Sequence, residues 1–144
     1  MPLRYTDRIV GRLRSEGLKI TPQRVAILRF LDGNRGHPSV DEIYREVSKT
    51  FPTLSLATVY NTLGTLEKIR EVQTVHVDSS RKRYDPDPSS HHHLMCRRCG
   101  TVRDVHADLG PSLAVPFDLS HEFQVESASV AFRGVCRECA ASAL

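Results

Sequence analysis

Two stretches, Cys96-Arg97-Arg98-Cys99 and Cys136-Arg137-Glu138-Cys139, decide the fold of the C-terminal part of this chain, and they hold all 4 of its cysteines. The two thiolates of a C-x-x-C pair sit on one tight turn and point the same way, so each pair supplies two corners of a tetrahedron. Two such pairs predict a closed zinc site made of four thiolates. Because a closed site leaves no coordination position for a substrate, we interpret this zinc as structural.

Two other interpretations of these cysteines fit the sequence less well than zinc. A C-x-x-C can be a redox pair in a thioredoxin-like unit, but that would leave the second pair without a role. Two disulfides in a secreted domain would require a leader, and residues 1–20 are charged and lack the apolar segment of a signal peptide. Reduced cysteines therefore predict a cytoplasmic protein. No apolar run approaches the ~20 residues of a membrane span, so no membrane partner is expected.

The basic residues of the chain are concentrated in its first part. The 144 residues suffice for one ordinary domain or two small ones. Lys and Arg outnumber Asp and Glu by 15 to 11 up to Ser89, and they number 5 against 6 from Ser90 onward. This asymmetry suggests a part that faces nucleic acid and a separate control part. On charge alone, an ordinary solvated surface is the simpler explanation.

Three amphipathic helices are predicted before residue 53. The first spans Tyr5 to Ser15 and ends at Gly17. The second has Thr21 as N-cap and Pro22 at its first position, and Asp32-Gly33-Asn34 ends it. The third opens on a capping box in which Ser39 caps the helix and Glu42 reaches back, and it ends at Phe51-Pro52. Their expected inner positions are Val25, Leu28 and Leu31 in the second helix, and Ile43, Tyr44 and Val47 in the third.

A fourth helix, capped by Ser55, has the pattern expected of a recognition helix. Its apolar positions recur at helical spacing and comprise Leu56, Val59, Tyr60, Leu63, Leu66 and Ile69. The other face carries Ala57, Thr58, Asn61 and Thr62, whose small or amide side chains suit a major groove. Asn can bond an adenine edge, and Thr or Ala can touch a thymine methyl group. A core helix whose outer face happens to be small is the alternative.

A β-hairpin is predicted directly after this helix, from Glu71 to Tyr84, with Val75 and Val77 on one face and a turn at Ser79-Ser80. A hairpin in this position is the wing of a winged helix, and its basic residues suit contacts to the DNA backbone or minor groove. The alternative is that Arg81 to Arg83 form an ordinary solvated turn with no role in DNA binding. The capped helices, the small or amide side chains on the outer face of the fourth helix, and the basic hairpin together favour DNA binding. The predicted DNA-contacting residues are Ser55, Ala57, Thr58, Tyr60, Asn61, Thr62, Arg81, Lys82 and Arg83.

The predicted fold class is α+β with two domains. Residues 1–84 form a winged-helix DNA-binding domain, 85–90 a proline-stiffened hinge linker, and 91–144 a small α/β dimerisation and metal-binding domain. In the last part we expect short strands at Leu94-Met95 and Val102–Val105, a longer strand from Gln124 to Val135, and at most a short or distorted helix within Leu109–Leu119. Only about 55 residues remain there, so zinc or homodimerisation is expected to stabilise the domain.

A second metal-binding pattern precedes the first cysteine pair. His91 and His93 alternate at the start of a strand, so both rings face one side and His92 faces the other. Asp104, on the next strand, is expected to reach the His91/His93 side. Nitrogen and oxygen donors suit Fe(II), Mn(II) or other borderline divalent ions. A surface cluster of histidines is the alternative. A third interpretation, an open hydrolytic zinc site made by His91, His93 and Asp104, would make the protein an enzyme.

From about Leu18 to Cys139 the chain resembles the ferric uptake regulator (Fur) family of bacterial metalloregulators. The resemblance rests on Thr21-Pro22-Gln23-Arg24, His37-Pro38-Ser39-Val40-Asp41-Glu42-Ile43-Tyr44, Ser55-Leu56-Ala57-Thr58-Val59-Tyr60-Asn61-Thr62-Leu63, Arg83-Tyr84-Asp85, the stretch from His91 to Gly100, and the last C-x-x-C. It implies a non-enzymatic homodimer whose metal-bound form binds a palindromic operator in double-stranded DNA and represses. It also implies structural zinc on Cys96, Cys99, Cys136 and Cys139, and regulatory Fe(II) or Mn(II) on His37, Asp85, His91, His93 and Asp104.

Within the family the chain is most similar to the peroxide-sensing (PerR) branch, because aspartate stands at both 85 and 104. That branch implies a repressor of the peroxide stress response, in which Fe(II)-catalysed oxidation by hydrogen peroxide strikes ligand histidines, here His37 and His91. The alternative is an iron- or manganese-responsive uptake repressor without peroxide sensing. Three roles stay open: Asp87 instead of Asp85 as hinge ligand, His92 as a competing donor, and His106 and His121 as ligands of a second site.

Overall fold

The computed structural model describes residues 5–78, 80–109 and 115–142, which fall into two compact units, residues 1–88 and 89–144. The division lies within the segment that the sequence predicts as the hinge linker. Among the described helices, none is long and apolar enough to span a bilayer.

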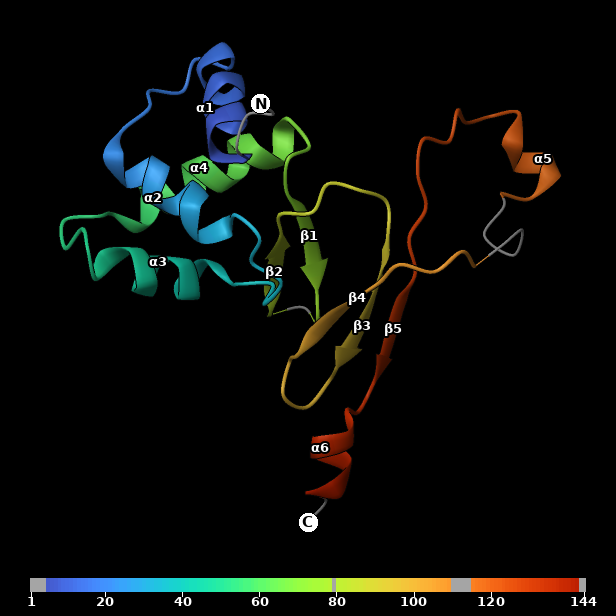
Figure 1. Ribbon diagram of the computed structural model, residues 1–144. Helices are drawn as coiled ribbons and strands as arrows, with labels where there is room; N and C mark the ends of the chain where they lie inside the picture. The colour runs from blue at the N-terminus through green and yellow to red at the C-terminus, as the bar shows by residue number, and fades with distance from the viewer. Residues whose placement is uncertain (1–4, 79, 110–114, 143–144) are drawn as a thin grey trace. The chain divides into compact units, whose positions relative to one another are not determined.

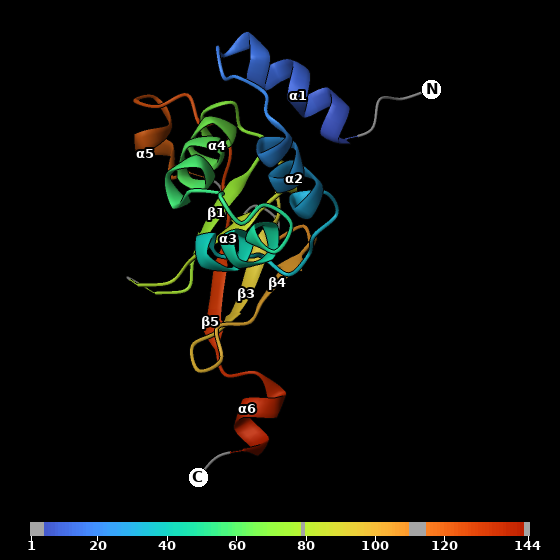
Figure 2. The same cartoon turned by 90° about the vertical axis from the view of Figure 1, so that its left-hand side faces the viewer.

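The helices of the first unit are α1 (Tyr5–Ser15), α2 (Pro22–Leu31), α3 (Val40–Ser48) and α4 (Leu56–Lys68), which pack together as Figures 1 and 2 show. The predicted caps are confirmed, because the side chains of Thr21, Ser39 and Ser55 each accept a hydrogen bond from the backbone N–H three residues on. The predicted back-reach of Glu42 is wrong. Its carboxylate instead binds the Arg83 guanidinium on the hairpin.

The helices enclose one apolar core. Its fully buried members are Ile9, Leu13, Ile27, Leu28, Leu31, Ile43, Val59, Leu63 and Leu66. In α2 the core position is Ile27, while Val25, predicted to be inside, is half-buried. In α4 the predicted apolar face is wrong at its start, because Leu56 and Tyr60 are 41% and 54% exposed. The face that packs on the core is rotated towards Thr62, so these two side chains lie outside it.

The predicted hairpin is confirmed as β1 (Gln73–His76) paired antiparallel with β2 (Lys82–Asp85). Val75 and Val77 are buried, as their alternation indicates. Asp85, predicted to begin the linker, is instead the last residue of β2 and pairs with Gln73. Its side chain is thereby held by a sheet and not by a flexible connection.

A buried carboxylate fastens α1 to the junction of α4 and β1. Glu71 is 3% exposed and accepts two hydrogen bonds from Arg8, at 2.7 and 3.1 Å, and a further one from Arg12. Arg12 also donates to the Ile69 carbonyl at 2.9 Å. A carboxylate out of water is stable only with such partners.

Replacing Glu71 with Gln is therefore expected to destabilise the first unit by about 1–3 kcal/mol, because the two guanidinium groups lose the negative charge and one of the two oxygen atoms that accept their hydrogen bonds. Urea unfolding followed by circular dichroism measures this change. The matched control is Glu16→Gln, which removes a surface ion pair with Lys68 and should cost less than about 1 kcal/mol. Equal effects of the two variants would contradict the assigned role of Glu71.

The second unit contains a three-stranded sheet in the order β4-β3-β5, with β3 (His92–Cys96), β4 (Val102–Val105) and β5 (Ala131–Gly134). β3 is antiparallel to β4 and parallel to β5. Short helices α5 (Phe117–Ser120) and α6 (Arg137–Ala141) complete it. The two early strands and the short α5 confirm the predictions for the described residues, whereas residues 110–114 of the expected helical segment lie outside them.

The predicted long strand from Gln124 to Val135 is wrong in extent. Only Ala131–Gly134 pairs with β3, and the described residues 124–130 form no regular element. A strand needs a neighbour for its backbone groups, and β3 offers register partners only to this short stretch. The alternation of apolar residues before Ala131 does not by itself provide a neighbouring strand.

Candidate metal centres and DNA-binding face

The four cysteines converge at the end of the sheet in the second unit. Their sulfur atoms all lie within 4.8 Å of one another, and all four are free thiols. Gly100, with φ of 78°, closes the first C-x-x-C turn, and the Arg97 N–H donates to the Gly134 carbonyl at 2.8 Å. This bond holds the first turn beside the end of β5, from which the chain runs directly into Cys136.

The spacing of the sulfur atoms fits a tetrahedral zinc ion. Four sulfur ligands at about 2.3 Å from zinc would lie about 3.8 Å apart, and the Cys99 and Cys136 sulfur atoms are separated by 3.8 Å. The Arg98 guanidinium donates to the Cys139 carbonyl at 3.1 Å, which ties the two turns together outside the cluster. The donor set is all sulfur and suits zinc, in agreement with the sequence prediction.

The thiol environment also favours a bound cation. Backbone N–H groups of Cys136 and Cys99 donate to the Cys96 sulfur, at 3.3 and 3.5 Å, and lower the pKa of this thiol to about 5. A hydrogen bond with Cys136 raises the pKa of Cys139 to about 12. Thiolates this close repel one another, so one thiol keeps its proton until a divalent cation offsets the repulsion.

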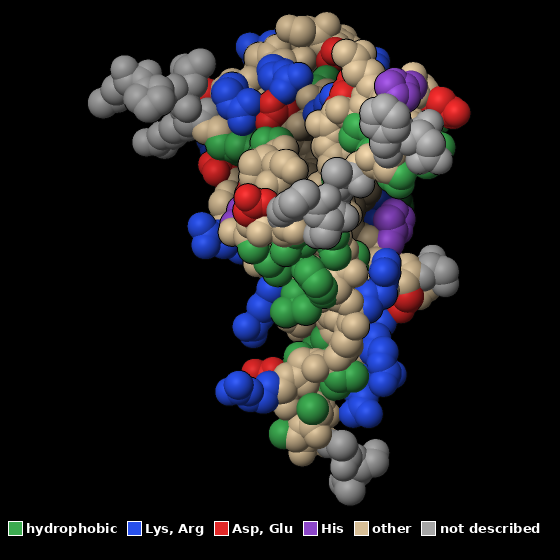
Figure 3. Space-filling view, turned by 90° about the vertical axis from the view of Figure 1, so that its right-hand side faces the viewer, with side chains coloured by type: hydrophobic (Ala, Val, Ile, Leu, Met, Phe, Trp, Pro, Cys, Tyr) green, Lys and Arg blue, Asp and Glu red, His purple; other side chains and the backbone are tan. Residues whose placement is uncertain are grey.

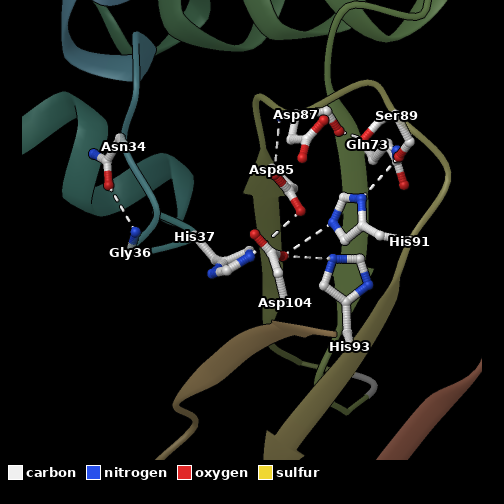
Figure 4. A network of polar contacts seen from close by, with 10 residues as sticks. All are labelled: Asn34, Gly36, His37, Gln73, Asp85, Asp87, Ser89, His91, His93 and Asp104. Carbon is white, nitrogen blue, oxygen red and sulfur yellow. Dashed lines mark hydrogen bonds and ion pairs between the residues drawn. The ribbon is translucent and has the colours of Figure 1, made fainter. Parts of the chain in front are cut away.

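In the first unit, His37 and Asp85 form a buried pair. Their side chains are 1% and 3% exposed, and His37 Nε2 lies 3.4 Å from Asp85 Oδ2. His37 adopts a φ of 50° on the loop before α3, and the Tyr84 N–H donates to the Pro38 carbonyl at 2.9 Å. The loop is thus bonded to β2 at the residue beside Asp85. Figure 4 shows the two side chains facing each other.

The competing hinge carboxylate, Asp87, is placed differently. The Asp87 N–H donates to Asp85 Oδ1 at 2.9 Å, and the Asp87 carbonyl accepts a hydrogen bond from the Gln73 side chain at 3.0 Å. Asp87 therefore orients the Asp85 carboxylate through its backbone. The pair with His37 favours Asp85 as the metal ligand of the first unit.

In the second unit, His91 and His93 converge on Asp104 (Figure 4). Asp104 Oδ1 lies 3.0 Å from His91 Nε2 and 3.3 Å from His93 Nε2. The register of β3 and β4 pairs His93 with Asp104, which accounts for the approach predicted from alternation. His91 Nδ1 donates to the Ser89 carbonyl at 2.8 Å, so Nε2 is the nitrogen that faces the carboxylate.

Three further histidines have distinct environments. His92 Nδ1 accepts a hydrogen bond from the Val130 N–H at 2.9 Å, so this ring ties β3 to the chain entering β5. His106 is exposed and stacks on His91, with ring centroids 4.8 Å apart. Sequence reasoning left this stacking unrecognised, although residue 106 lies two positions from Asp104 on the same side of the chain. His121 is exposed.

Most of the α4 residues predicted to contact DNA are accessible, and their contact with DNA stays a prediction. Ser55, Ala57, Tyr60 and Asn61 are exposed and Thr58 is half-buried. Thr62 is fully buried, and its hydroxyl donates to the Thr58 carbonyl at 2.7 Å. The expectation that Thr62 lies on the exposed face is therefore wrong, because its position on the helix points into the core.

The basic residues of the hairpin all engage carboxylates. Arg81 binds Asp78 within the turn at 2.6 Å, Lys82 binds Glu67 of α4 at 3.2 Å, and Arg83 binds Glu42 of α3. The Arg83 side chain is 18% exposed, whereas the Lys82 side chain is 41% exposed. The three basic residues that the sequence predicts as DNA contacts are thus each ion-paired within the protein.

Comparisons with known proteins agree with this architecture. The model of the ferric uptake regulator family matches residues 15–139. The peroxide-responsive repressor PerR of Staphylococcus epidermidis is 37% identical over 136 residues, covering 92% of this chain and 89% of that protein.

Solved structures show the same relationship. The peroxide stress regulator of Campylobacter jejuni matches with a TM-score of 0.68 and 32% identity, covering 91% of this chain and 98% of that one. The ferric uptake regulator Fur of Helicobacter pylori shares the fold, with a TM-score of 0.74 and 23% identity over 93% of this chain and 90% of that one. Spanning nearly the whole sequence, these matches show that the chain belongs to the ferric uptake regulator family.

Proposed function

We propose that the protein is a metal-dependent transcriptional repressor that senses hydrogen peroxide through Fe(II)-catalysed oxidation of its ligand histidines. Members of this family are transcriptional regulators and not enzymes, and its curated relatives include peroxide-responsive repressors. Zinc on Cys96, Cys99, Cys136 and Cys139 is structural. With its thiolates kept reduced, the protein is expected to act in the cytoplasm.

The observation that carries this proposal is a set of buried or partly buried nitrogen and oxygen donors on each side of the linker. His37 and Asp85 supply one set, and His91, His93 and Asp104 the other. The donor types suit Fe(II) and Mn(II) and contrast with the all-sulfur cluster. The bond from His91 Nδ1 to the Ser89 carbonyl fixes the ring so that Nε2 is the donor towards a metal.

One ion bound by all five side chains would act as a clip across the linker. Asp85 and His91 are six residues apart, so their Cα atoms can never be separated by more than about 20 Å. An ion that binds both sets favours the arrangement of the two units in which the two sets lie together. It does so because its affinity for that arrangement is higher than its affinity for the others. Two recognition helices of a dimer would then be held about 34 Å apart, as a palindromic operator requires.

Exposed apolar side chains on the second unit support homodimerisation. Leu94, Leu119, Phe123, Val125 and Phe132 are each at least 40% exposed, and Figure 3 shows hydrophobic side chains gathered on one face. A unit of this size gains stability by covering such a surface with a second copy. Phe123 and Val125 are the most exposed of these five side chains, so we expect the contact to include the segment that carries them.

For peroxide sensing, bound Fe(II) would supply the activation of hydrogen peroxide. His37 and His91 are the target side chains, and the ring carbon of either gains one oxygen atom from the peroxide while the other leaves as water. The oxidised ring is a poorer ligand, so the link between the two units is lost and DNA is released. Asp85 and Asp104 hold the unoxidised rings in place through the contacts described above.

Mass spectrometry of tryptic peptides after mild hydrogen peroxide treatment tests this function. A gain of one oxygen on the His37 or His91 peptide is expected with the Fe(II)-loaded protein and not with the Mn(II)-loaded protein, together with loss of DNA binding. Unmodified histidines with intact DNA binding would instead indicate an iron- or manganese-responsive uptake repressor. The exposed His76, outside both sets, serves as the internal control.

A further inference from the structure

The strand β2 is bonded to a different part of the first unit at each of its residues. Lys82 binds Glu67 on α4, and Arg83 binds Glu42 on α3. The Tyr84 N–H donates to the Pro38 carbonyl, and Asp85 contacts His37. The hairpin is therefore fastened to the helices through its second strand.

The first two residues of this strand, Lys82 and Arg83, line a pocket that α3 and α4 also line. The pocket has a volume of about 510 Å³, and its lining includes Glu42, Tyr60, Glu67, Lys82 and Arg83. Two ion pairs cross this pocket. The Lys82–Glu67 pair joins the hairpin to α4 and the Arg83–Glu42 pair joins it to α3, while the neighbouring Tyr84 side chain packs into the helical core.

We propose that Glu67 and Glu42 are positioning residues for DNA recognition: Glu67 holds the hairpin to α4 by binding Lys82, and Glu42 holds it to α3 by binding Arg83. Arg83, with 18% of its side chain exposed, is committed to Glu42 and is not a DNA contact. Lys82, stacked 5.1 Å from the Tyr84 ring centre, is held in the same way. This inference rests on the DNA-binding function proposed above.

The alternative is that the carboxylates are mere neighbours and that Lys82 neutralises a phosphate. The two arrangements predict opposite effects of the Glu67→Gln substitution on DNA affinity. If Glu67 positions the hairpin, Glu67→Gln weakens DNA binding. If Lys82 contacts phosphate, removing a nearby negative charge strengthens it. The slope of log K against log salt gives a second criterion, because loss of one phosphate contact lowers it by about 1.

Fluorescence anisotropy at several salt concentrations tests the proposal, with a labelled duplex selected from a random library by the Mn(II)-loaded wild-type protein. We expect Glu67→Gln and Lys82→Met each to weaken binding about threefold, as for a partly exposed ion pair. The double variant should be no weaker than either single variant, and all three should keep the wild-type salt slope. Glu42→Gln and Arg83→Met should behave as a second pair of this kind.

Glu46→Gln and Lys49→Met are the matched controls. They change the net charge as Glu67→Gln and Lys82→Met do, but they remove an exposed ion pair at the end of α3, in which Lys49 Nζ lies 2.8 Å from Glu46 Oε1. Each control variant should change the affinity for DNA only by the amount that its change in net charge produces. Stronger binding by Glu67→Gln, a lower salt slope for Lys82→Met, or no effect of either would overturn the inference. Failure of the wild-type protein to select any duplex would instead contradict the proposed function.

Discussion

Replacing Cys136 with serine is expected to unfold the second unit and abolish the dimer. Metal binding to a structural zinc site of this kind carries an apparent free energy of about 10–16 kcal/mol at neutral pH. The second unit has only a three-stranded sheet and two short helices among its described residues, so it lacks a core able to replace that contribution. The Cys136 N–H also donates to the Cys96 sulfur, which makes this position central to the cluster.

Three measurements check this expectation. Elemental analysis should show about one zinc per chain in the wild-type protein and none in the variant, light scattering should show a monomer, and circular dichroism should retain the helices of the first unit. Arg137→Ser is the matched control, because it places serine on the same turn without removing a sulfur. A Cys136→Ser dimer that still holds zinc with wild-type stability would refute the assignment of this cluster as the structural centre.

The second large effect is expected for His37→Ala, which should remove metal-dependent DNA binding while leaving the fold intact. His37 is the nitrogen donor that we propose for the first unit, so its loss would leave Asp85 alone to link that unit to the metal. We expect the metal-dependent gain in DNA affinity to fall by about 100-fold, the upper range of coupling between two sites. Titration with Mn(II), followed by anisotropy of the selected duplex, measures this gain.

His76→Ala provides the comparison, since His76 is an exposed histidine on β1 of the same unit. It should bind metal and DNA as the wild type does. The zinc content of both variants should equal that of the wild type, because the cysteine cluster lies in the other unit. Full metal-dependent binding by His37→Ala would exclude His37 from the regulatory ligands and leave the zinc assignment untouched.

Local rules account for what the sequence predicted well. The caps at Thr21, Ser39 and Ser55 follow from hydrogen bonds that span three residues. The approach of His91 and His93 to one carboxylate follows from the alternation of side chains along a strand. In each case the interacting groups lie within a few residues or on adjacent strands of one hairpin.

The errors arose where the deciding partner is distant in the sequence. Tyr60 and Thr62 border the apolar face of α4, and only packing against the other helices determines that Thr62 is buried and Tyr60 exposed. Asp85 belongs to β2 because Gln73 pairs with it. The residues before Ala131 are not strand because β3 pairs only with the last stretch.

By itself, the sequence determined the cluster of four cysteines, the capped helices and the hairpin, because the spacing of residues along the chain carries that information. The regulatory ligand set followed only from the resemblance to a family and stays a prediction. Tertiary structure alone decided that Asp85 and not Asp87 faces His37, and that His91 is oriented by the Ser89 carbonyl. It also decided that the hairpin cations bind Glu67 and Glu42. These contacts join atoms that only the folded backbone brings together, and no local propensity specifies them.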